Sequence, residues 1–380
     1  MTDLFTKSIK IILEHQAENG AYVASPSFTN YLFCWLRDGS YIAYAMDQAG
    51  QHASAEGFYR WVNQTIARHA YKVDQLEQQL AEQVPPAELS VLHTRFLLNG
   101  DEEDPESKWG HFQIDGYGTW LWGLCNHVRM TGNYGLLREF RESINCSIRY
   151  LKLTWQLPNY DCWEEHPEYI HPYSLAAVYG GFKEVADLVE AGIYQDCPYP
   201  VAEYAAELKS YLMQYAVGDG RFVKHIAPAV GKKTPQPLVA PGVDASLMGF
   251  SVPYQVVEPA NPLFTRTLAE MQKNLVRADG GVYRYKADTY YGGGEWLLLS
   301  AWLGWCYTVT GNIAEAERLL RWVERCADAD GNLPEQVTAH PLAAGKYQEW
   351  VDAWGKVASP LLWSHAMYII LSVELKNAYS

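Results

Sequence analysis

Two adjacent carboxylates, Glu164 and Glu165, follow Trp163 directly in the segment 157–182. Neighbouring carboxylates repel each other, so their pairing calls for an explanation. One explanation is a solvated acidic loop. The other is that one group holds a proton while its neighbour binds a polar, hydroxyl-rich ligand. Nearby aromatic residues favour the second explanation, because sugar rings stack their C–H faces on aromatic surfaces. They are Tyr160, Trp163, Tyr169 and Tyr173.

A second candidate acidic residue, Glu335, lies in the polar segment 328–337 (DADGNLPEQV) between two helical patterns. Taken alone, it fits equally well as a surface glutamate in a turn. If the fold brings it to the same cleft as Glu164, the pair has the residue types for glycoside hydrolysis. In that chemistry one carboxyl group donates a proton to the leaving oxygen and the other activates water.

Buried helices would have to position these two residues. Apolar helical segments begin near residues 39, 115, 171, 244, 294 and 359, about 64 residues apart on average, and at least one amphipathic helix separates each from the next. Six buried helices ringed by amphipathic ones indicate an all-α fold, a six-hairpin (α/α)6 barrel. A solenoid of helical pairs is the alternative, but its repeats would be shorter and more alike.

Periodicity and capping residues predict the individual helices. The amphipathic segments are residues 3–18, 52–69, 136–155, 183–192, 201–214, 262–276 and 313–326. The apolar segments are residues 39–50, 115–132, 171–182, 244–250, 292–311 and 359–375. Signals for β-strands are confined to residues 281–285 and 221–225. Segment 227–242 resembles a long barrel loop more than a linker, so we expect a single domain over residues 1–380 with long loops at the active-site end.

Polar or aromatic residues stand at or just before the start of each predicted inner helix. Inner helices of an α/α barrel all start at the same end, so these residues should converge on one cleft. The ordinary preference of helix N-termini for acidic residues explains Asp38, Asp115 and Asp244 one by one. It does not explain the accompanying tryptophans, Arg37 or the paired glutamates.

The composition narrows the classes of partner. The chain has 380 residues, a formal net charge of −14 and a pI of about 5.2, which argues against nucleic acid and anionic membranes. Its seven cysteines include no CxxC pair, so thiols in a reducing compartment are expected. The first 20 residues lack the pattern of a signal peptide, and no run reaches the roughly 18 apolar residues of a membrane span. We therefore expect a cytoplasmic protein.

Five segments, in one order along residues 31–366, resemble motifs of glycoside hydrolase family 15, the glucoamylase-like inverting enzymes with a six-hairpin α/α barrel. YLFCWLRD (residues 31–38) resembles the family's Y-x-x-x-W-x-R-D. The resemblance implies that Arg37 and Asp38 hold the hydroxyls of the terminal glucose. It also implies that Tyr31 helps to place the hydrolytic water and that Trp35 contacts the substrate.

The two acidic segments also resemble the family's motifs. CWEE (residues 162–165) resembles W-E-E, which implies that Glu164 is the general acid and that Trp163 and Glu165 bind sugar. LPEQV (residues 333–337) resembles the motif of the general base, which implies that role for Glu335.

The last two segments imply further sugar contacts. RYKADTYYGGGEW (residues 284–296) is similar to R-Y-x-x-D-x-Y-Y…W and implies contacts by Arg284, Tyr290 and Trp296. LLWSHA (residues 361–366) resembles L-x-W-S-x-A and implies that Trp363 lines the cleft.

These features predict an exo-acting, inverting α-glucosidase that releases β-glucose from short α-1,6- or α-1,4-linked gluco-oligosaccharides. The alternatives are another α/α-barrel carbohydrate hydrolase, such as a trehalase or a hydrolase of a glucosylated small acid, and a catalytically silent sugar-binding protein. The partner is then a small sugar rather than nucleic acid or membrane. No cofactor is predicted and no metal, because His166 and His171 lack an accompanying HExxH or Cys/His set. The sequence does not report the oligomeric state, and charged outer helices are compatible with a monomer.

Overall fold

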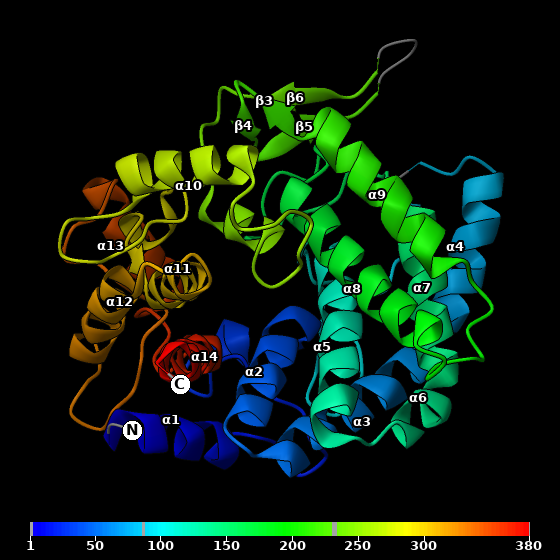
Figure 1. Ribbon diagram of the computed structural model, residues 1–380, viewed down its shortest axis with the longest axis horizontal. Coiled ribbons are helices and arrows are strands. Elements are labelled where there is room, and N and C mark those ends of the chain that lie inside the picture. The colour runs from blue at the N-terminus through cyan, green and yellow to red at the C-terminus, as the bar shows by residue number, and fades with distance from the viewer. Residues whose placement is uncertain (1–2, 86–87, 230–233, 380) are drawn as a thin grey trace.

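The computed structural model describes residues 3–85, 88–229 and 234–379. Over these residues the chain is mostly helical, and its β-strands are only two or three residues long. The helices form an inner ring and an outer layer that covers it (Figure 1). The predicted all-α toroid is therefore confirmed. Every helix within the described residues is too short or too polar to span a lipid bilayer.

The inner ring consists of six segments that are buried over most of their length. Each packs on the next, and the last packs on the first, which closes the ring. Helices covered on every side are apolar all round, and this is why their sequences lack a polar face. The six are α2 (Leu36–Gln48), α5 (Asp115–Thr131), α8 (Pro172–Glu190), η3 (Ala245–Phe250), α11 (Leu297–Val309) and α14 (Leu362–Ala378).

The outer layer consists of amphipathic helices, each packed on an inner neighbour. They are α1 (Asp3–Glu14), α3 (His52–His69), α7 (Arg141–Thr154), α9 (Val201–Tyr215), α10 (Pro262–Leu275) and α12 (Ile313–Arg325). The first helix, α1, packs on the last, α14, so both chain ends lie on the same side of the ring (Figure 1).

Several predicted helices differ in type or extent. Segment 244–250 forms a 3₁₀ helix rather than an α-helix. Pro253 follows closely, and a proline cannot donate its nitrogen to a helix and restricts the residue before it. The two predicted helices 171–182 and 183–192 are one helix, α8, whose second half emerges from the core and becomes amphipathic. Segment 136–155 is divided at Phe140 into α6 (Gly135–Glu139) and α7.

Among the described residues two α-helices were missed, and the strand predictions were partly wrong. The missed helices are α4 (Tyr71–Ala81) and α13 (Tyr347–Trp354). In segment 281–285 only Val282 forms a β-bridge, to Val276. Segment 221–225 contributes to two hairpins, in which β3 (Val217–Gly218) pairs with β4 (Arg221–Phe222) and β5 (His225–Ala227) with β6 (Gln236–Leu238). The predicted loop 227–242 thus contains β6, and its residues 230–233 lie outside the described residues.

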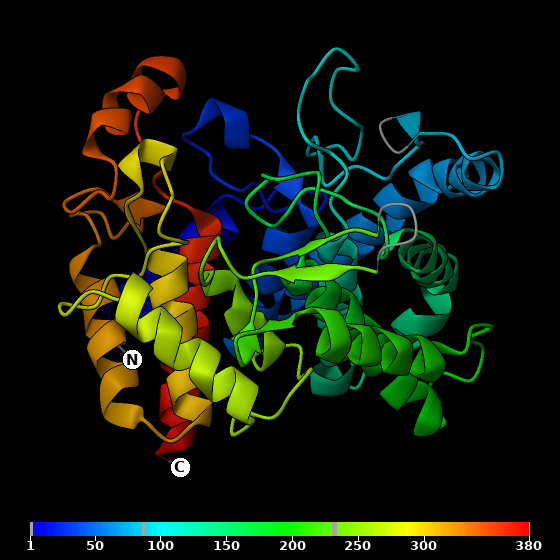
Figure 2. The same cartoon turned by 90° about the horizontal axis from the view of Figure 1, so that it is seen from above.

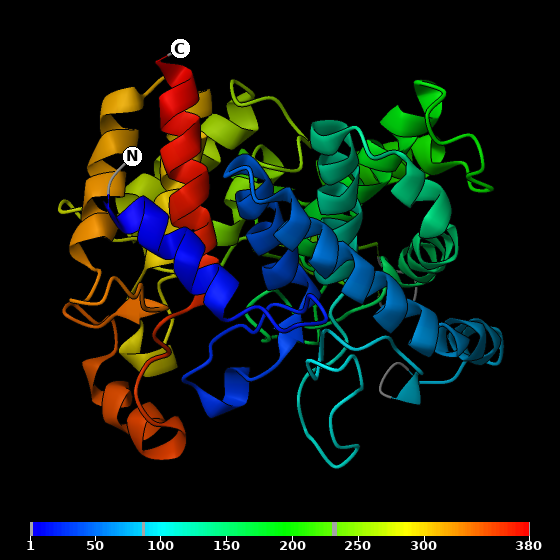
Figure 3. The ribbon, with the colours of Figure 1, turned by 90° about the horizontal axis from the view of Figure 1, so that it is seen from below.

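Short antiparallel strand pairs, formed by segments far apart in the sequence, lie where the chain enters two of the inner helices. Strand β1 (Cys34–Trp35) pairs with β2 (Arg95–Phe96) and leads directly into α2. Strand β7 (Glu295–Trp296) pairs with β8 (Gln336–Val337) and leads directly into α11. The tight turn after α1 needs a glycine, because Gly20 has φ +99° and an added Cβ would lie 2.2 Å from a backbone oxygen. Figures 2 and 3 show that these segments and α13 gather at one end of the barrel, away from the C-terminus.

Candidate active site

All twelve residues predicted to form the site line one cavity of about 340 Å³. They come from the segments that precede or open the inner helices, so the common start of those helices brings them together. The residues are Tyr31, Trp35, Arg37, Asp38, Trp163, Glu164, Glu165, Arg284, Tyr290, Trp296, Glu335 and Trp363.

The backbone at Glu164 is held in an unusual conformation. Glu164 has φ +68°, in the left-handed region that side chains other than glycine rarely adopt. Asp161 stabilises the turn: its Oδ1 accepts hydrogen bonds from the backbone N–H groups of Trp163 and Glu165, both at 2.9 Å. The Glu164 N–H donates to the Asp161 carbonyl, also at 2.9 Å. Strain that is held by surrounding contacts is typical of functional sites.

Hydrogen bonds to Glu164 determine which of its oxygens can carry a proton. Its Oε1 accepts from Trp35 Nε1 at 2.7 Å and from Gln113 Nε2 at 3.1 Å. The Gln113 amide cannot turn around, because its oxygen accepts from Arg37 and Thr94, both at 3.1 Å. Since Oε1 is occupied as an acceptor, a proton on this carboxyl group must reside on Oε2.

Glu335 is almost completely buried, with 2% of its surface exposed. Its Oε1 accepts a hydrogen bond of 2.8 Å from the Tyr31 hydroxyl, and its Oε2 has no hydrogen-bond partner among the described residues. The Tyr31 oxygen also lies 2.8 Å from the Tyr290 hydroxyl. Because the Tyr31 O–H already donates a hydrogen bond to Glu335, Tyr290 is the donor in this second hydrogen bond. Burial raises the pKa of Glu335 to about 8, although the Tyr31 hydrogen bond and the nearby Arg284 charge oppose the rise.

Arg37 and Asp38 present polar atoms that the protein leaves partly unsatisfied. Arg37 is anchored by Asp115, whose Oδ2 lies 3.0 Å from its Nη1. Its Nε and Asp38 Oδ2 are 3.5 Å apart, and neither forms a hydrogen bond with the described residues. Burial raises the pKa of Asp38 to about 7. Buried groups of this kind bind strongly to ligand hydroxyls, because the alternative is to stay unpaired.

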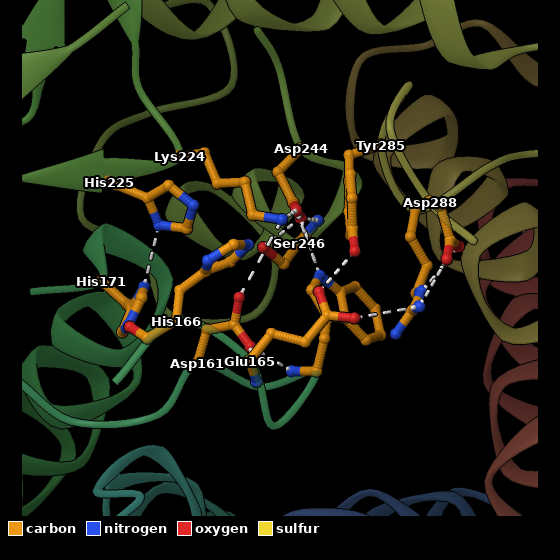
Figure 4. Close-up of polar contacts among 12 residues, drawn as sticks. Asp161, Glu165, His166, His171, Lys224, His225, Asp244, Ser246, Tyr285 and Asp288 are labelled. Carbon is orange, nitrogen blue, oxygen red and sulfur yellow. Dashed lines mark hydrogen bonds and ion pairs between the residues drawn. The ribbon is translucent and has the colours of Figure 1, made fainter. Parts of the chain in front are cut away.

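The second carboxylate of the pair, Glu165, is held by Tyr285 (Figure 4) and by Arg284. The Tyr285 hydroxyl donates to Glu165 Oε2, and Arg284 Nη2 lies 3.5 Å from Oε1. Arg284 is itself fixed by two hydrogen bonds to Asp288, at 2.8 and 2.6 Å. Its guanidinium carbon lies 5.0 Å from the centre of the Trp296 ring. The adjacent glutamates therefore face different partners, which explains how both fit in one loop.

A buried ion pair between Lys224 and Asp244 lies beside this loop and supports it (Figure 4). The Trp163 indole donates to both oxygens of Asp244 at 3.1 Å. Lys224 Nζ lies 3.1 Å from Asp244 Oδ2 and 4.0 Å from Asp161 Oδ2. One ammonium group thus compensates the two carboxylates that hold the backbone and the indole of this segment.

Asp161, His171 and His225 offer three potential metal ligands within 4.8 Å of one another. His171 Nε2 must carry a proton, because it faces the carbonyl oxygens of Asn159 at 2.7 Å and His166 at 3.0 Å. Its Nδ1 therefore accepts from His225 Nδ1, 3.1 Å away. Burial lowers the pKa of His171 to about 3. Both rings are hydrogen-bonded, and the Lys224 ammonium lies 4.0 Å from Asp161 Oδ2, where it supplies the positive charge that a cation would bring. The cluster therefore fits a loop clamp better than a cation site.

A comparison with known proteins identifies the family. The family model described as glycosyl hydrolases family 15 matches residues 2–360. The chain belongs to this family. An isomaltose glucohydrolase from Kribbella flavida is 40% identical over 378 residues, which cover 98% of this chain and 92% of that protein.

Solved structures agree with this assignment. A glycosidase in complex with glucose is 39% identical, with a TM-score of 0.89 over 98% of this chain and 96% of the other. A bacterial glucoamylase complexed with acarbose is 18% identical and shares the fold, with a TM-score of 0.75 over 99% of this chain and 56% of its own. The family 15 chain is thus a glycoside hydrolase with a glucoamylase-like barrel, as the five motifs predicted.

Sequence reasoning missed part of the family 15 site. Gln113 and Asp115 drew attention only as polar residues before an inner helix, and nothing in their local sequence assigns them to Glu164 and Arg37. The cavity wall includes Tyr160, one of the aromatic residues expected to contact sugar. It also includes residues with no predicted role: Lys108, Trp109, Gly110, Cys162, Trp350 and Trp354. Trp350 and Trp354 belong to α13, an eight-residue helix without a fully buried residue, so it has no strong apolar pattern to reveal it.

Proposed function

We propose that the protein is an exo-acting, inverting α-glucosidase that releases β-glucose from the non-reducing end of short α-1,6- or α-1,4-linked gluco-oligosaccharides, with isomaltose as the first candidate. The observation that carries the proposal is that Glu164 and Glu335 line the same small cavity. Pockets for small molecules measure roughly 300–1,000 Å³, so a cavity of about 340 Å³ suits a disaccharide better than a long glucan. Similarity to an isomaltose glucohydrolase supports this substrate class.

Substrate binding would rest on the unsatisfied polar groups and the aromatic walls. Arg37, Asp38, Glu165 and Arg284 would hold the hydroxyls of one glucose residue. The indole N–H groups of Trp296 and Trp363 make no hydrogen bond with the described residues and would add two donors. Apart from the partly exposed Glu165, these groups are buried, so their interactions with a sugar would lose little to solvent or to reorganisation.

The chemical step would use the two glutamates in different roles. Glu164 would donate its Oε2 proton to the glycosidic oxygen as the bond from that oxygen to C1 breaks. Glu335 would accept a proton from a water molecule whose oxygen attacks C1 from the opposite face. Glu335 Oε2 has no hydrogen-bond partner among the described residues and would be free to accept that proton. A raised pKa makes Glu335 a stronger base once it is ionised.

A substrate panel with product analysis tests the proposal. Purified enzyme is given isomaltose, maltose, trehalose, kojibiose and nigerose, and the first anomer of released glucose is followed by ¹H NMR. We expect hydrolysis of isomaltose or maltose with β-glucose appearing first, and none in the Glu164→Gln control. Initial α-glucose would refute inversion. A clear preference for trehalose would favour a trehalase, and glucose binding without hydrolysis would favour a sugar-binding protein.

The organisation and location of the chain belong to the same proposal. A single catalytic domain over residues 1–380 is supported by one hydrophobic cluster that extends from Phe5 to Leu375. A cytoplasmic location is supported by seven free cysteines, four of them buried. The net charge of −14 continues to favour a neutral sugar over nucleic acid or an anionic membrane as partner.

A further inference from the structure

Two tryptophans from distant segments meet at the cavity and take no part in the roles proposed above. Trp109 precedes α5, and Trp354 ends α13. Their ring centres are 6.0 Å apart, with an angle of 26° between the planes, so the rings are stacked. Both residues line the cavity. The contact therefore joins two otherwise separate segments of the cavity wall.

Trp109 is held firmly on its side of the contact. The Arg95 guanidinium carbon lies 3.5 Å from the centre of the Trp109 ring and 4.0 Å from that of Phe33. Arg95 Nη2 forms an ion pair of 2.6 Å with Glu103, and its Nη1 donates to the Asn30 carbonyl at 3.1 Å. A cation sandwiched between two rings and paired with a carboxylate leaves Trp109 little freedom to move.

Trp354 is held less firmly. No residue of α13 is fully buried. The helix packs chiefly on η4 (Tyr290–Gly292) and η5 (Ala344–Lys346). Segments with few buried contacts open at a low cost in free energy. In addition, Trp350 of α13 lies 4.9 Å from the Tyr290 ring, which links the helix to the Tyr31 and Glu335 hydrogen bonds.

We infer that Trp109 and Trp354 form an aromatic closure that limits the substrate to about two sugar residues. The inference rests on the proposed function. The inner part of the cavity, with its charged and indole groups, takes the non-reducing glucose, and the space next to the stacked rings takes one more residue. A third residue would have to separate rings that are in contact. An aromatic pair contributes about 0.5–1.5 kcal/mol beyond its buried area. Its loss therefore corresponds to roughly a 2- to 12-fold change in kcat/KM for a longer substrate relative to a disaccharide.

The test compares substrates of different length in three variants: Trp109→Ala, Trp354→Ala and the double variant. We measure kcat/KM for isomaltose, isomaltotriose and isomaltotetraose. Each single variant should raise the ratio of trisaccharide to disaccharide by roughly 2- to 12-fold. The double variant should raise it no further, because either change breaks the same contact. The closure would be overturned if the ratios stayed unchanged in the single variants. It would also be overturned if the effect in the double variant equalled the product of the two single effects.

Two control variants separate the closure from damage to α13. Trp354→Phe keeps an aromatic ring and should retain most of the preference for the disaccharide. Asp352→Ala changes an exposed residue of the same helix that does not line the cavity, and it should leave the ratio unchanged. If Asp352→Ala changed the ratio as much as Trp354→Ala does, any disturbance of the helix would have this effect. The ring contact would then have no role of its own in substrate length.

A measurement without substrate keeps the closure distinct from the proposed function. In protein labelled with 5-fluorotryptophan, the ¹⁹F signal of Trp109 is assigned by its loss in Trp109→Phe. Replacement of Trp354 by alanine should shift that signal, because a stacked neighbouring ring is removed. An unshifted signal would refute the contact. If the enzyme cleaved none of the α-glucosides, the proposed function would fail, and the NMR result would still decide whether the rings meet.

Discussion

Replacement of the proposed general base, Glu335→Gln, should abolish activity and at the same time stabilise the protein in a pH-dependent manner. Burial raises the pKa of Glu335 from its ordinary value of 4.5 to about 8. Between these two values the folded protein keeps a proton that the unfolded chain releases. The unfolded state then binds fewer protons than the folded state, so the free energy of unfolding falls as pH rises. Because glutamine does not ionise, the free energy of unfolding of Glu335→Gln does not fall with pH for this reason.

The size of the effect follows from the same pKa values. Each pH unit between about 4.5 and about 8 lowers the stability of the wild type by about 1.36 kcal/mol. Over the whole interval the advantage of Glu335→Gln should therefore grow by at most about 5 kcal/mol. Below pH 4.5 and above pH 8 the difference between the two proteins should stay constant, because both states then bind the same number of protons.

Thermal unfolding measured at intervals between pH 4 and pH 9 tests this prediction. The difference in Tm between Glu335→Gln and the wild type should increase through that range and level off near pH 8. The matched control is Glu190→Gln, an exposed glutamate at the end of α8, whose difference in Tm should not follow this curve. A difference for Glu335→Gln that is independent of pH, or that shrinks as pH rises, would refute the reasoning that burial keeps this carboxyl group protonated.

Three further substitutions test the proposed general acid, the hydrogen bond to the proposed base and the buried ion pair. Glu164→Gln should lower kcat by about 10²- to 10⁴-fold without changing the far-UV circular dichroism spectrum, and an active variant would show that another group supplies the proton. Tyr31→Phe removes a hydrogen bond that lowers the pKa of Glu335, so the rising limb of the pH profile of kcat/KM should move to higher pH; an unmoved limb would contradict this. Lys224→Met leaves two buried carboxylates without their cation and should lower the free energy of unfolding by about 3–5 kcal/mol in denaturant titrations. In contrast, Lys183→Met breaks an i,i+4 pair on the surface and should cost less than about 1 kcal/mol; equal losses would argue against the role of Lys224.

The layering of the fold could be predicted because it depends on local periodicity. Helix α3 has the predicted bounds, and α5 and α12 end one residue before the predicted position. Apolar residues at helical spacing decide which face is buried, and this pattern lies within a single segment. The pattern was less informative for α13, which buries no residue completely, and for η3, which forms a 3₁₀ helix in place of an α-helix.

The residue types that line the cavity were also accessible from short motifs, since each motif is local and each inner helix starts at the same end of the barrel. The properties of those residues were not accessible. The pKa of Glu335 depends on burial by segments from the whole ring and on a hydrogen bond from Tyr31, about 300 positions earlier in the chain. In the same way, the free oxygen of Glu164 is defined by Trp35 and Gln113.

Local order in the chain therefore dictated a helical barrel and the chemical groups at one end of it. Tertiary structure alone decided which oxygen of Glu164 can hold a proton, how far burial raises the pKa of Glu335 and that Trp109 meets Trp354. The physical reason is the range of the interactions. Helical periodicity acts over a few residues, whereas desolvation, hydrogen bonding and ring stacking depend on atoms that only folding brings within a few ångströms of one another.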